Sequence, residues 1–165
     1  MLAGQASPDA GFEGFFRGQY PALCRALTLL TGDPLEAQDL AQEALARVYE
    51  RWDRVAAMDS AGGYLYRIAL NLQRKQVMRR WRPAVFGPGS GGGVDPAEVI
   101  EARAEVARML GALPLGQRQA LVLIEWLGLE VREAARVLGI KPASVRVRVH
   151  RAKTTLRDQF GLADD

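Results

Sequence analysis

The chain of 165 residues carries 22 Lys and Arg side chains against 19 Asp and Glu, and 48% of its residues are hydrophobic. These values suit one globular domain or two small ones, and they exclude a disordered chain. The single cysteine, Cys24, and the single histidine, His150, exclude an internal disulfide and a Cys-rich or His-rich metal site, and they count against a His-dependent triad. The N-terminus does not resemble a signal peptide and no apolar run could span a membrane, so the cytoplasm is the expected compartment.

Charge alternates along the chain. Residues 1–59 carry 5 basic and 9 acidic side chains, residues 60–94 carry 6 and 0, residues 95–140 carry 5 and 7, and residues 141–165 carry 6 and 3. A basic segment is often only a solvated face. Two such segments in one chain also indicate two contacts with a polyanion.

The first half of the sequence predicts three helices. Apolar residues recur at three- and four-residue spacing from Phe12 to Leu30, and this helix stops at Thr31-Gly32. Asp33-Pro34 begins the second helix with a capping Asp and a Pro at the first helical position, and its apolar stripe runs to Trp52. The third helix runs from about Gly63 to Trp81.

Residues 83–94 are dense in Gly and Pro and predict a flexible linker between two helical modules, residues 1–82 and 95–165. A Gly-rich coil of this length has a root-mean-square span of about 20 Å and can stretch to about 40 Å. The two modules can therefore occupy separated sites.

The second module predicts four further helices. The first begins at Asp95-Pro96 and is stopped by Pro114, and the others run from about Gly116 to Leu127, Val131 to Leu138 and Pro142 to Phe160. The alternation from Val145 to His150 is locally typical of a strand, but a helix places Val145, Val149, Ala152 and Leu156 on one face and explains more residues. The predicted fold is all-α.

Residues 131–152 have the pattern of a helix-turn-helix. Small residues, Ala134 and Ala135, stand where two helices would meet, Gly139 stands at the turn, and a basic helix follows. A basic helix fits the major groove, where Arg pairs with guanine. An ordinary helical hairpin with a basic face is the alternative, and the coincidence of these signals favours DNA binding.

Two surfaces stand out on the first module. Asp39, Gln42 and Glu43 share one face of the second helix, which is by itself most typical of a solvated surface. Asp39 and Glu43 could also be paired catalytic carboxylates, but nothing else in the chain completes such a site. The third helix interleaves basic residues with Tyr64, Tyr66 and Trp81, a pattern that suits an unpaired nucleic-acid strand, although at least one of these rings is expected in the core.

Three segments together resemble the extracytoplasmic-function (ECF) sigma factors of the bacterial sigma-70 family. LEAQDLAQEALARVYERWDRV (35–55) resembles the family's DAEDLVQEVFLRAW, and YLYRIALNLQRKQVMRR (64–80) resembles WLYRIARNLARDLLRR. Residues 110–157 resemble the reader of the minus-thirty-five element, with its LP-x-x-x-R start and V-x-x-R-x-x-R-A close. Lys75 stands in place of the usual Asp and Val147 in place of a Ser, and both departures bear on the promoter sequence that is read.

The resemblance implies a promoter-specificity subunit of RNA polymerase, with sigma region 2 at residues 1–82 and sigma region 4 at 95–165. It implies that Asp39, Gln42 and Glu43 dock on the clamp of the polymerase β′ subunit. The residues that it implies for melting and reading the minus-ten element are Ser60, Tyr64, Arg67, Asn71, Arg74, Lys75, Arg79 and Arg80. Those that it implies for the minus-thirty-five element are Lys141, Ser144, Arg146, Val147, Arg148, His150 and Arg151.

The expected partners are core RNA polymerase, through its β′ clamp and β flap, and promoter DNA, and an anti-sigma factor is a further candidate. No cofactor, metal, catalytic residue or membrane insertion is expected. Two other classes remain as alternatives. One is a stand-alone helix-turn-helix regulator that binds an operator without polymerase, and the other is a hydrolase that uses Asp39 and Glu43.

Overall fold

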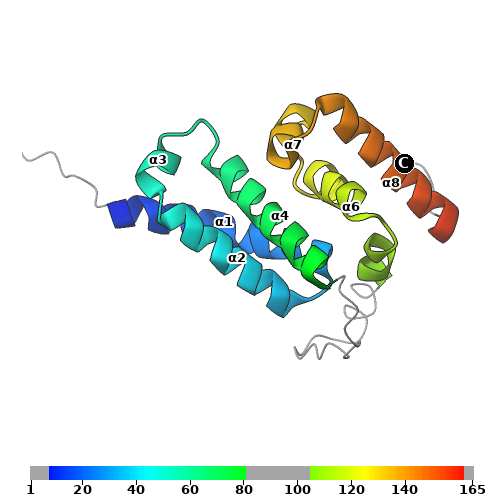
Figure 1. Ribbon diagram of the computed structural model, residues 1–165, viewed down its shortest axis with the longest axis horizontal. Helices are drawn as coiled ribbons and strands as arrows, with labels where there is room; N and C mark the ends of the chain where they lie inside the picture. The colour runs from blue at the N-terminus through cyan, green and yellow to red at the C-terminus, as the bar shows by residue number, and fades with distance from the viewer. Residues whose placement is uncertain (1–7, 81–104, 162–165) are drawn as a thin grey trace, which may run out of the picture.

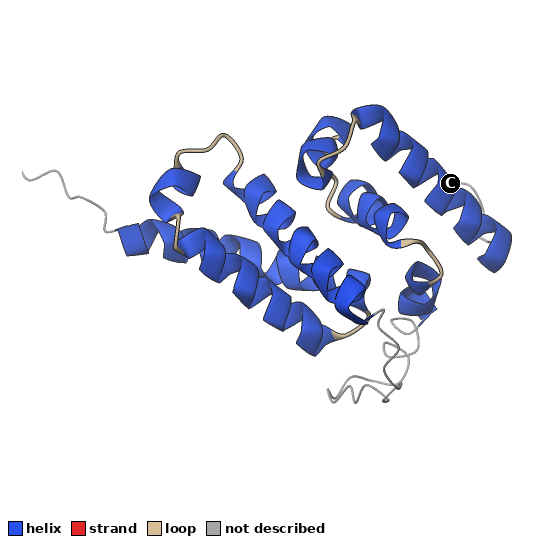
Figure 2. Ribbon diagram, in the orientation of Figure 1, coloured by secondary structure: helices blue, strands red, loops and turns tan. Residues whose placement is uncertain are grey.

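The computed structural model describes residues 8–80 and 105–161, and every regular element in these two ranges is a helix (Figure 2). The all-α prediction is confirmed. The linker predicted at 83–94 and the helix start predicted at Asp95-Pro96 lie outside the described residues.

The first module consists of α1 (Pro8–Thr31), α2 (Pro34–Tyr49), α3 (Trp52–Ala56) and α4 (Ala61–Arg80). The three long helices follow the sequence prediction. Trp52, expected at the end of the second helix, instead begins the short α3, because the backbone leaves the helical region at Arg51 with φ of −126°.

The break between α1 and α2 follows from local chemistry. Gly32 has a φ of +74°, a left-handed conformation that ends α1. The Asp33 carboxylate then accepts a hydrogen bond from the Leu35 N–H at 2.9 Å, and Pro34 occupies the first helical position, which needs no donor. The predicted cap is confirmed.

The core of this module lies between α1, α2 and α4. Leucines from α1, including Leu23 and Leu27, pack against a stripe of small residues on α2 that includes Ala37, Ala41 and Ala44, and all five side chains are buried. Alanines at this spacing let the helices approach closely. The opposite face of α2 is thereby left exposed.

In the second module, residues 105–111 are helical, and α6 (Leu115–Leu121) continues directly into a π-helical turn, η1 (Val122–Trp126). The sequence predicted one uniform helix over this span. The Leu127 N–H bonds the Val122 carbonyl at 3.0 Å, five residues back, so the helix widens before it ends at Gly128, whose φ is +66°.

The helix-turn-helix is formed by α7 (Val131–Leu138) and α8 (Pro142–Phe160). Gly139 ends α7 with a φ of +66°, and Pro142 stands at the start of α8. The strand suggested locally at residues 145–150 is not formed: Val145, Ala152 and Leu156 are buried on one helical face, so the helical interpretation is confirmed.

The two modules lie against each other. Figure 1 shows α4 lying between the rest of the first module and the helices α6 and α7. Helix α7 contacts α4, and α1 contacts η1. The sequence indicated only that the modules could separate, because the apolar pattern of each one is complete without the other.

Candidate nucleic-acid and protein interfaces

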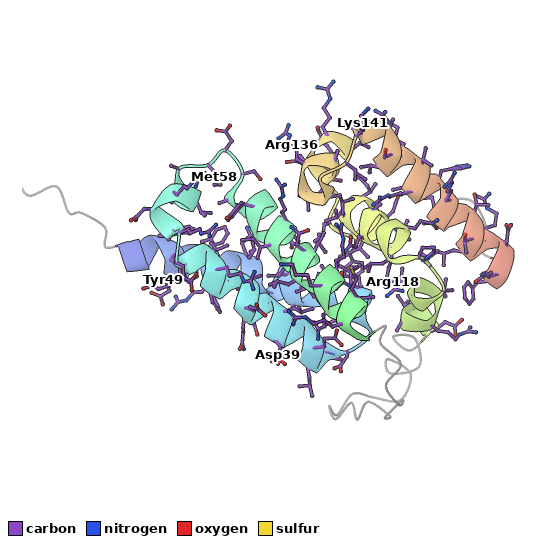
Figure 3. All side chains as sticks on the ribbon, viewed as in Figure 1. Asp39, Tyr49, Met58, Arg118, Arg136 and Lys141 are labelled. Atoms are coloured by element: carbon purple, nitrogen blue, oxygen red, sulfur yellow. The ribbon has the colours of Figure 1, made fainter. Side chains whose placement is uncertain are left out.

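The acidic face of α2 is fully available to a partner. Asp39, Gln42 and Glu43 are exposed, whereas Leu40 and Ala44 on the other side of the helix are buried. Glu43 forms an ion pair with Arg47 at 2.6 Å. Figure 3 places Asp39 at the outer edge of the first module, away from α7 and α8.

The third helix of the sequence analysis, α4, presents three different faces. Leu65, Ala69 and Leu72 are buried in the first module, and Tyr66, Leu70 and Gln73 are buried on the side of the second module. The remaining face carries basic and amide side chains that are all exposed: Arg67, Asn71, Arg74, Lys75 and Arg79. The side chain of Arg80 lies outside the described residues. This basic face of α4 has no acidic residue.

The loop before α4 adds two of the predicted side chains. The Ser60 hydroxyl accepts a hydrogen bond from the Gly63 N–H at 3.1 Å and so caps the helix. Tyr64 is half-buried, and its hydroxyl accepts a long hydrogen bond of 3.5 Å from Arg51. Tyr66 is the ring that belongs to the core, and burial raises the pKa of its hydroxyl.

A hollow of about 290 Å³ lies between the end of α2 and the start of α4. Its lining residues are Arg47, Glu50, Arg51, Tyr64 and Ile68. The sequence analysis did not single out Arg47 or Arg51. The sequence did contain a signal for them: their i, i+4 spacing, at the end of a helix that faces the basic segment, places the two side chains near each other.

The exposed side of α8 brings together most of the residues predicted to read the upstream element. Lys141, Arg146, His150 and Arg151 are exposed, and Val147 is 47% exposed. Ser144 is half-buried near the start of the helix. Val147 therefore does not belong to the core of the module.

Arg148 lies apart from this group. It is half-buried and turns toward the start of α6, where a Cβ built on Gly116 would stand 3.0 Å from its Nη1 atom. An alanine at position 116 would require the Arg148 guanidinium to shift by a few tenths of an ångström.

Three polar residues that the sequence analysis did not assign join the modules. Arg118 donates to the Leu30 carbonyl of α1 at 2.8 Å and to the Leu113 carbonyl at 3.1 Å, and burial lowers the pKa of its guanidinium. Gln119 donates to Gln73 of α4 at 2.9 Å. Arg118 is the Arg of the LP-x-x-x-R motif, so a signal for it was present, whereas nothing local marks Gln73. Figure 3 shows Arg118 at the junction of the modules.

No three His, Cys, Asp or Glu side chains come together as a metal site within residues 8–80 and 105–161. Over the same ranges, no helix has the length and apolar character needed to cross a bilayer.

One module carries a basic helix with neighbouring aromatic rings, and the other carries a helix-turn-helix. These two features define the chain as a nucleic-acid-binding protein of the helix-turn-helix class. Two family models make this specific. Sigma-70 region 2 matches residues 15–83, and sigma-70 region 4 matches residues 103–156.

Similar proteins agree with these matches. The chain is 32% identical to the RNA polymerase sigma-E factor of Streptomyces avermitilis over 159 residues, which cover 93% of this chain and 87% of that relative. It is 29% identical to the ECF RNA polymerase sigma factor EcfG of Rhodopseudomonas palustris over 140 residues, 82% of this chain and 77% of that relative.

Two solved structures share the fold. CnrH in complex with the cytosolic domain of CnrY matches with a TM-score of 0.72 and 24% identity over 93% of this chain and 89% of that one. The sigma factor RpoE of Bartonella quintana, in complex with the anti-sigma factor NepR, matches with a TM-score of 0.73 and 22% identity over 93% of this chain and 99% of that one.

The chain therefore belongs to the sigma-70 family and is a sigma factor of the ECF type. It binds core RNA polymerase, recognises promoter DNA and directs the initiation of transcription. The family prediction made from the motifs is confirmed.

Proposed function

We propose a division of labour in which residues 1–82 bind core polymerase and the minus-ten element, residues 83–94 form a linker, and residues 95–165 read the minus-thirty-five element. The single observation that carries this proposal is the pairing, in one chain, of an exposed basic face on α4 with an exposed reading face on α8.

The docking site for the β′ clamp is Asp39, Gln42 and Glu43. All three side chains are exposed on one face of α2, and a rigid helix with a buried opposite face holds them at fixed spacing. Carboxylates and an amide suit a basic partner surface, because charge complementarity directs association.

The minus-ten element is opened and held along α4. Arg67, Arg74, Lys75, Arg79 and Arg80 hold the phosphates of the unpaired strand. Ser60, Tyr64 and Asn71 read a base that has left the stack, with the Tyr64 ring offering a stacking surface. The absence of acidic side chains on this face supports the assignment, since none repels the strand.

The minus-thirty-five element is read by α8 in the major groove. Arg146, Val147, His150 and Arg151 face the base edges, and Lys141 and Ser144, at the start of the helix, contact phosphate. Arg148 reaches phosphate from the side of α6. The β flap of the polymerase is the second contact, and it binds region 4 of this chain.

The chain contributes recognition and no catalytic residue, and the polymerase supplies the chemistry. Because polymerase and chromosome share the cytoplasm, the protein works there. An anti-sigma factor is a further proposed partner, because the RpoE structure that shares this fold contains one.

The deciding experiment compares the full chain with and without core RNA polymerase. We expect it to copurify with core and to make core initiate at particular members of a promoter library, without binding those promoters tightly alone. A stand-alone helix-turn-helix regulator would instead bind duplex DNA without core and confer no initiation, and this result would overturn the proposal.

A further inference from the structure

Helix α2 exposes two large apolar side chains, Leu35 at 59% and Tyr49 at 52%. Neither is buried in the hydrophobic core of the first module. A single exposed apolar residue is common on protein surfaces and needs no explanation. These two, however, share the face of α2 that carries the proposed docking site for polymerase.

Helical geometry aligns the two apolar side chains with the polar ones between them. Leu35 and Tyr49 are separated by nearly four turns, which take about 14.4 residues, so both project from the same side of α2. Asp39 lies one turn after Leu35, and Gln42 lies two turns from either end. These four residues form the α2 stripe, which is about 21 Å long at about 1.5 Å per residue, polar in the middle and apolar at both ends.

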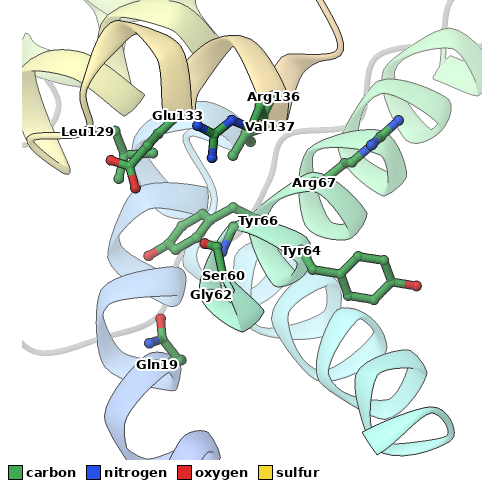
Figure 4. A pocket seen from close by; sticks show the side chains of 11 residues that line it. Gln19, Ser60, Gly62, Tyr64, Tyr66, Arg67, Leu129, Glu133, Arg136 and Val137 are labelled. Carbon is green, nitrogen blue, oxygen red and sulfur yellow. The ribbon is translucent and has the colours of Figure 1, made fainter. Parts of the chain in front are cut away.

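The α2 stripe lies on a part of the first module that the rest of the chain leaves free. Helix α2 packs on α1, α3 and α4 through its other faces. Figure 4 shows the cavity of about 380 Å³ between the modules, and none of the residues that line it comes from α2. Figure 3 shows Asp39 and Tyr49 along the outer edge of the first module, away from α7 and α8.

We propose that Leu35 and Tyr49 are the apolar anchors of the contact with core polymerase, one at each end of the polar docking site. The proposal rests on the docking role assigned above to Asp39, Gln42 and Glu43. The partner is the β′ clamp, because the anchors are continuous with that site on one helical face. The Asp39 carboxylate in the middle of the stripe excludes DNA, since it repels phosphate. The clamp must then present apolar groups about 21 Å apart, on either side of a basic centre.

The structure holds both anchors in position before polymerase binds. The Leu35 N–H donates to the Asp33 carboxylate at 2.9 Å, and Pro34 occupies the first helical position, so Leu35 lies in a capped first turn. The Tyr49 ring lies 4.9 Å from the ring of Phe12 on α1, centroid to centroid. Anchors that are preorganised in this way lose less conformational freedom on binding.

Charged and apolar side chains contribute differently to such a contact. The carboxylates of Asp39 and Glu43 act over a distance and speed up association, and salt screens this effect. Apolar anchors act only in contact, where they lengthen the life of the complex, and salt does not screen them. A kinetic experiment at two salt concentrations therefore separates the two contributions.

The first test measures binding of the full-length chain to immobilised core polymerase at about 0.1 M and about 0.5 M salt. Leu35→Gln exchanges the apolar side chain for a polar one of similar size, and it should raise the dissociation rate about tenfold at both salts. Asp39→Asn with Glu43→Gln should instead lower the association rate about tenfold at low salt and much less at high salt. Leu35→Met keeps an apolar side chain and should dissociate within about twofold of wild type.

Met78→Gln is the matched control. Met78 is 70% exposed, and its spacing from Asn71, Arg74 and Lys75 places it on the basic face of α4 and outside the α2 stripe. Both rate constants for core should match those of wild type. Circular dichroism and thermal unfolding check that each variant keeps its fold.

The second test identifies what covers the α2 stripe. The photoreactive amino acid p-benzoylphenylalanine replaces Leu35 or Tyr49 in the full-length chain, and the assembled holoenzyme is irradiated. We expect both positions to crosslink to β′. A crosslink to the β subunit, to promoter DNA or to a copurifying anti-sigma factor in place of β′ would contradict the choice of partner, and so would the absence of any crosslink.

Wild-type dissociation of Leu35→Gln at both salts would overturn the proposal. If the variant with Asp39→Asn and Glu43→Gln still associates slowly in that case, the polar docking site stands without its anchors. Wild-type kinetics in both variants would count against the proposed docking site itself.

Discussion

At the scale of single residues, the surfaces of this sigma factor depend on side chains that the fold leaves exposed and does not need. Glu43 forms an ion pair with Arg47, and both side chains are about half exposed, at 52% and 47%. Exposed pairs of this kind contribute at most about 1 kcal/mol to the free energy of unfolding. Changes on these surfaces should therefore affect binding far more than folding.

Reversing two charges on α2 tests the polymerase contact. Asp39→Lys with Glu43→Lys should lower the affinity for core polymerase by about tenfold or more, because complementary charge becomes repulsive. The measurement is a titration with labelled core at fixed salt. Glu13→Lys with Asp53→Lys makes the same change in net charge at exposed positions outside α2 and outside region 4, and should bind core normally. Unchanged affinity in the α2 variant would remove this assignment.

The basic face of α4 permits a test that separates affinity from base preference. Arg74→Ala with Lys75→Ala should weaken binding of open-promoter strands across all sequences and reduce the slope of log affinity against log salt by about 1.4, from two lost phosphate contacts. Arg54→Ala, on α3, is the control with one exposed charge removed.

Asn71→Ala should leave the salt slope nearly unchanged and alter the preferred base within the minus-ten element, because an amide reads base edges and carries no charge. This base preference is measured by selecting, with holoenzyme, from a promoter library in which the minus-ten element is randomised. Identical preferences in wild type and variant would show that Asn71 does not read a base.

Val147 is expected to pack on the C5-methyl group of a thymine beside a guanine contact from Arg146 or Arg151. Val147→Ser should therefore relax or shift base preference at one position of the minus-thirty-five element, because a serine hydroxyl does not replace the contact between the valine methyls and the thymine C5-methyl. The matched control is Val106→Ser. Val106 is also an exposed valine, with an exposed fraction of 42% against 47% for Val147, and it lies outside α8. The same promoter preferences in both variants would make Val147 a spectator.

At the scale of helices, the ends of the elements explain the folding of each module better than their interiors do. Asp33 caps α2 through its carboxylate, Ser60 caps α4 through its hydroxyl, and Gly139 ends α7 in a left-handed conformation. The turn at Gly139 sets the angle at which α8 leaves α7. The position of the proposed reading face therefore depends on the conformation of Gly139.

Gly139→Ala tests this dependence. A side chain at φ of +66° is strained, so the free energy of unfolding should fall by about 1 to 2 kcal/mol. Thermal and denaturant unfolding measure the change. Gly18→Ala, inside α1 with open space around the new methyl group, should instead stabilise the chain by about 0.5 to 1 kcal/mol. Equal effects in the two variants would contradict the conformational argument.

At the scale of the whole molecule, much of the fold was predictable from sequence. The boundaries of α7 and α8 agree with the predicted ones, because Gly139, Pro142 and Gly161 mark them chemically. Trp52 was misassigned and the π turn at Val122–Trp126 was missed. Neither leaves a periodic signal, since the break before α3 is a single non-helical residue, Arg51, and the π-helical segment is only five residues long.

The candidate surfaces were also predictable as far as they are local. Helical spacing alone groups Asp39 with Glu43 and Arg67 with Asn71, and all four are exposed. Spacing could not place Arg148, which leans on Gly116, or the hollow that Arg51 shares with Tyr64. Both contacts join residues far apart in the chain, and only packing brings them together.

The sequence by itself determined the helices, their division into two modules, the family and the faces that carry charge, because periodicity, caps and motifs are properties of short segments. Only the tertiary structure decided that the modules close on each other through Arg118, Gln73 and Gln119. No local pattern marks an interface made by two amides 46 residues apart in sequence. Such a contact depends on the relative position of complete modules, which no short segment of the sequence specifies.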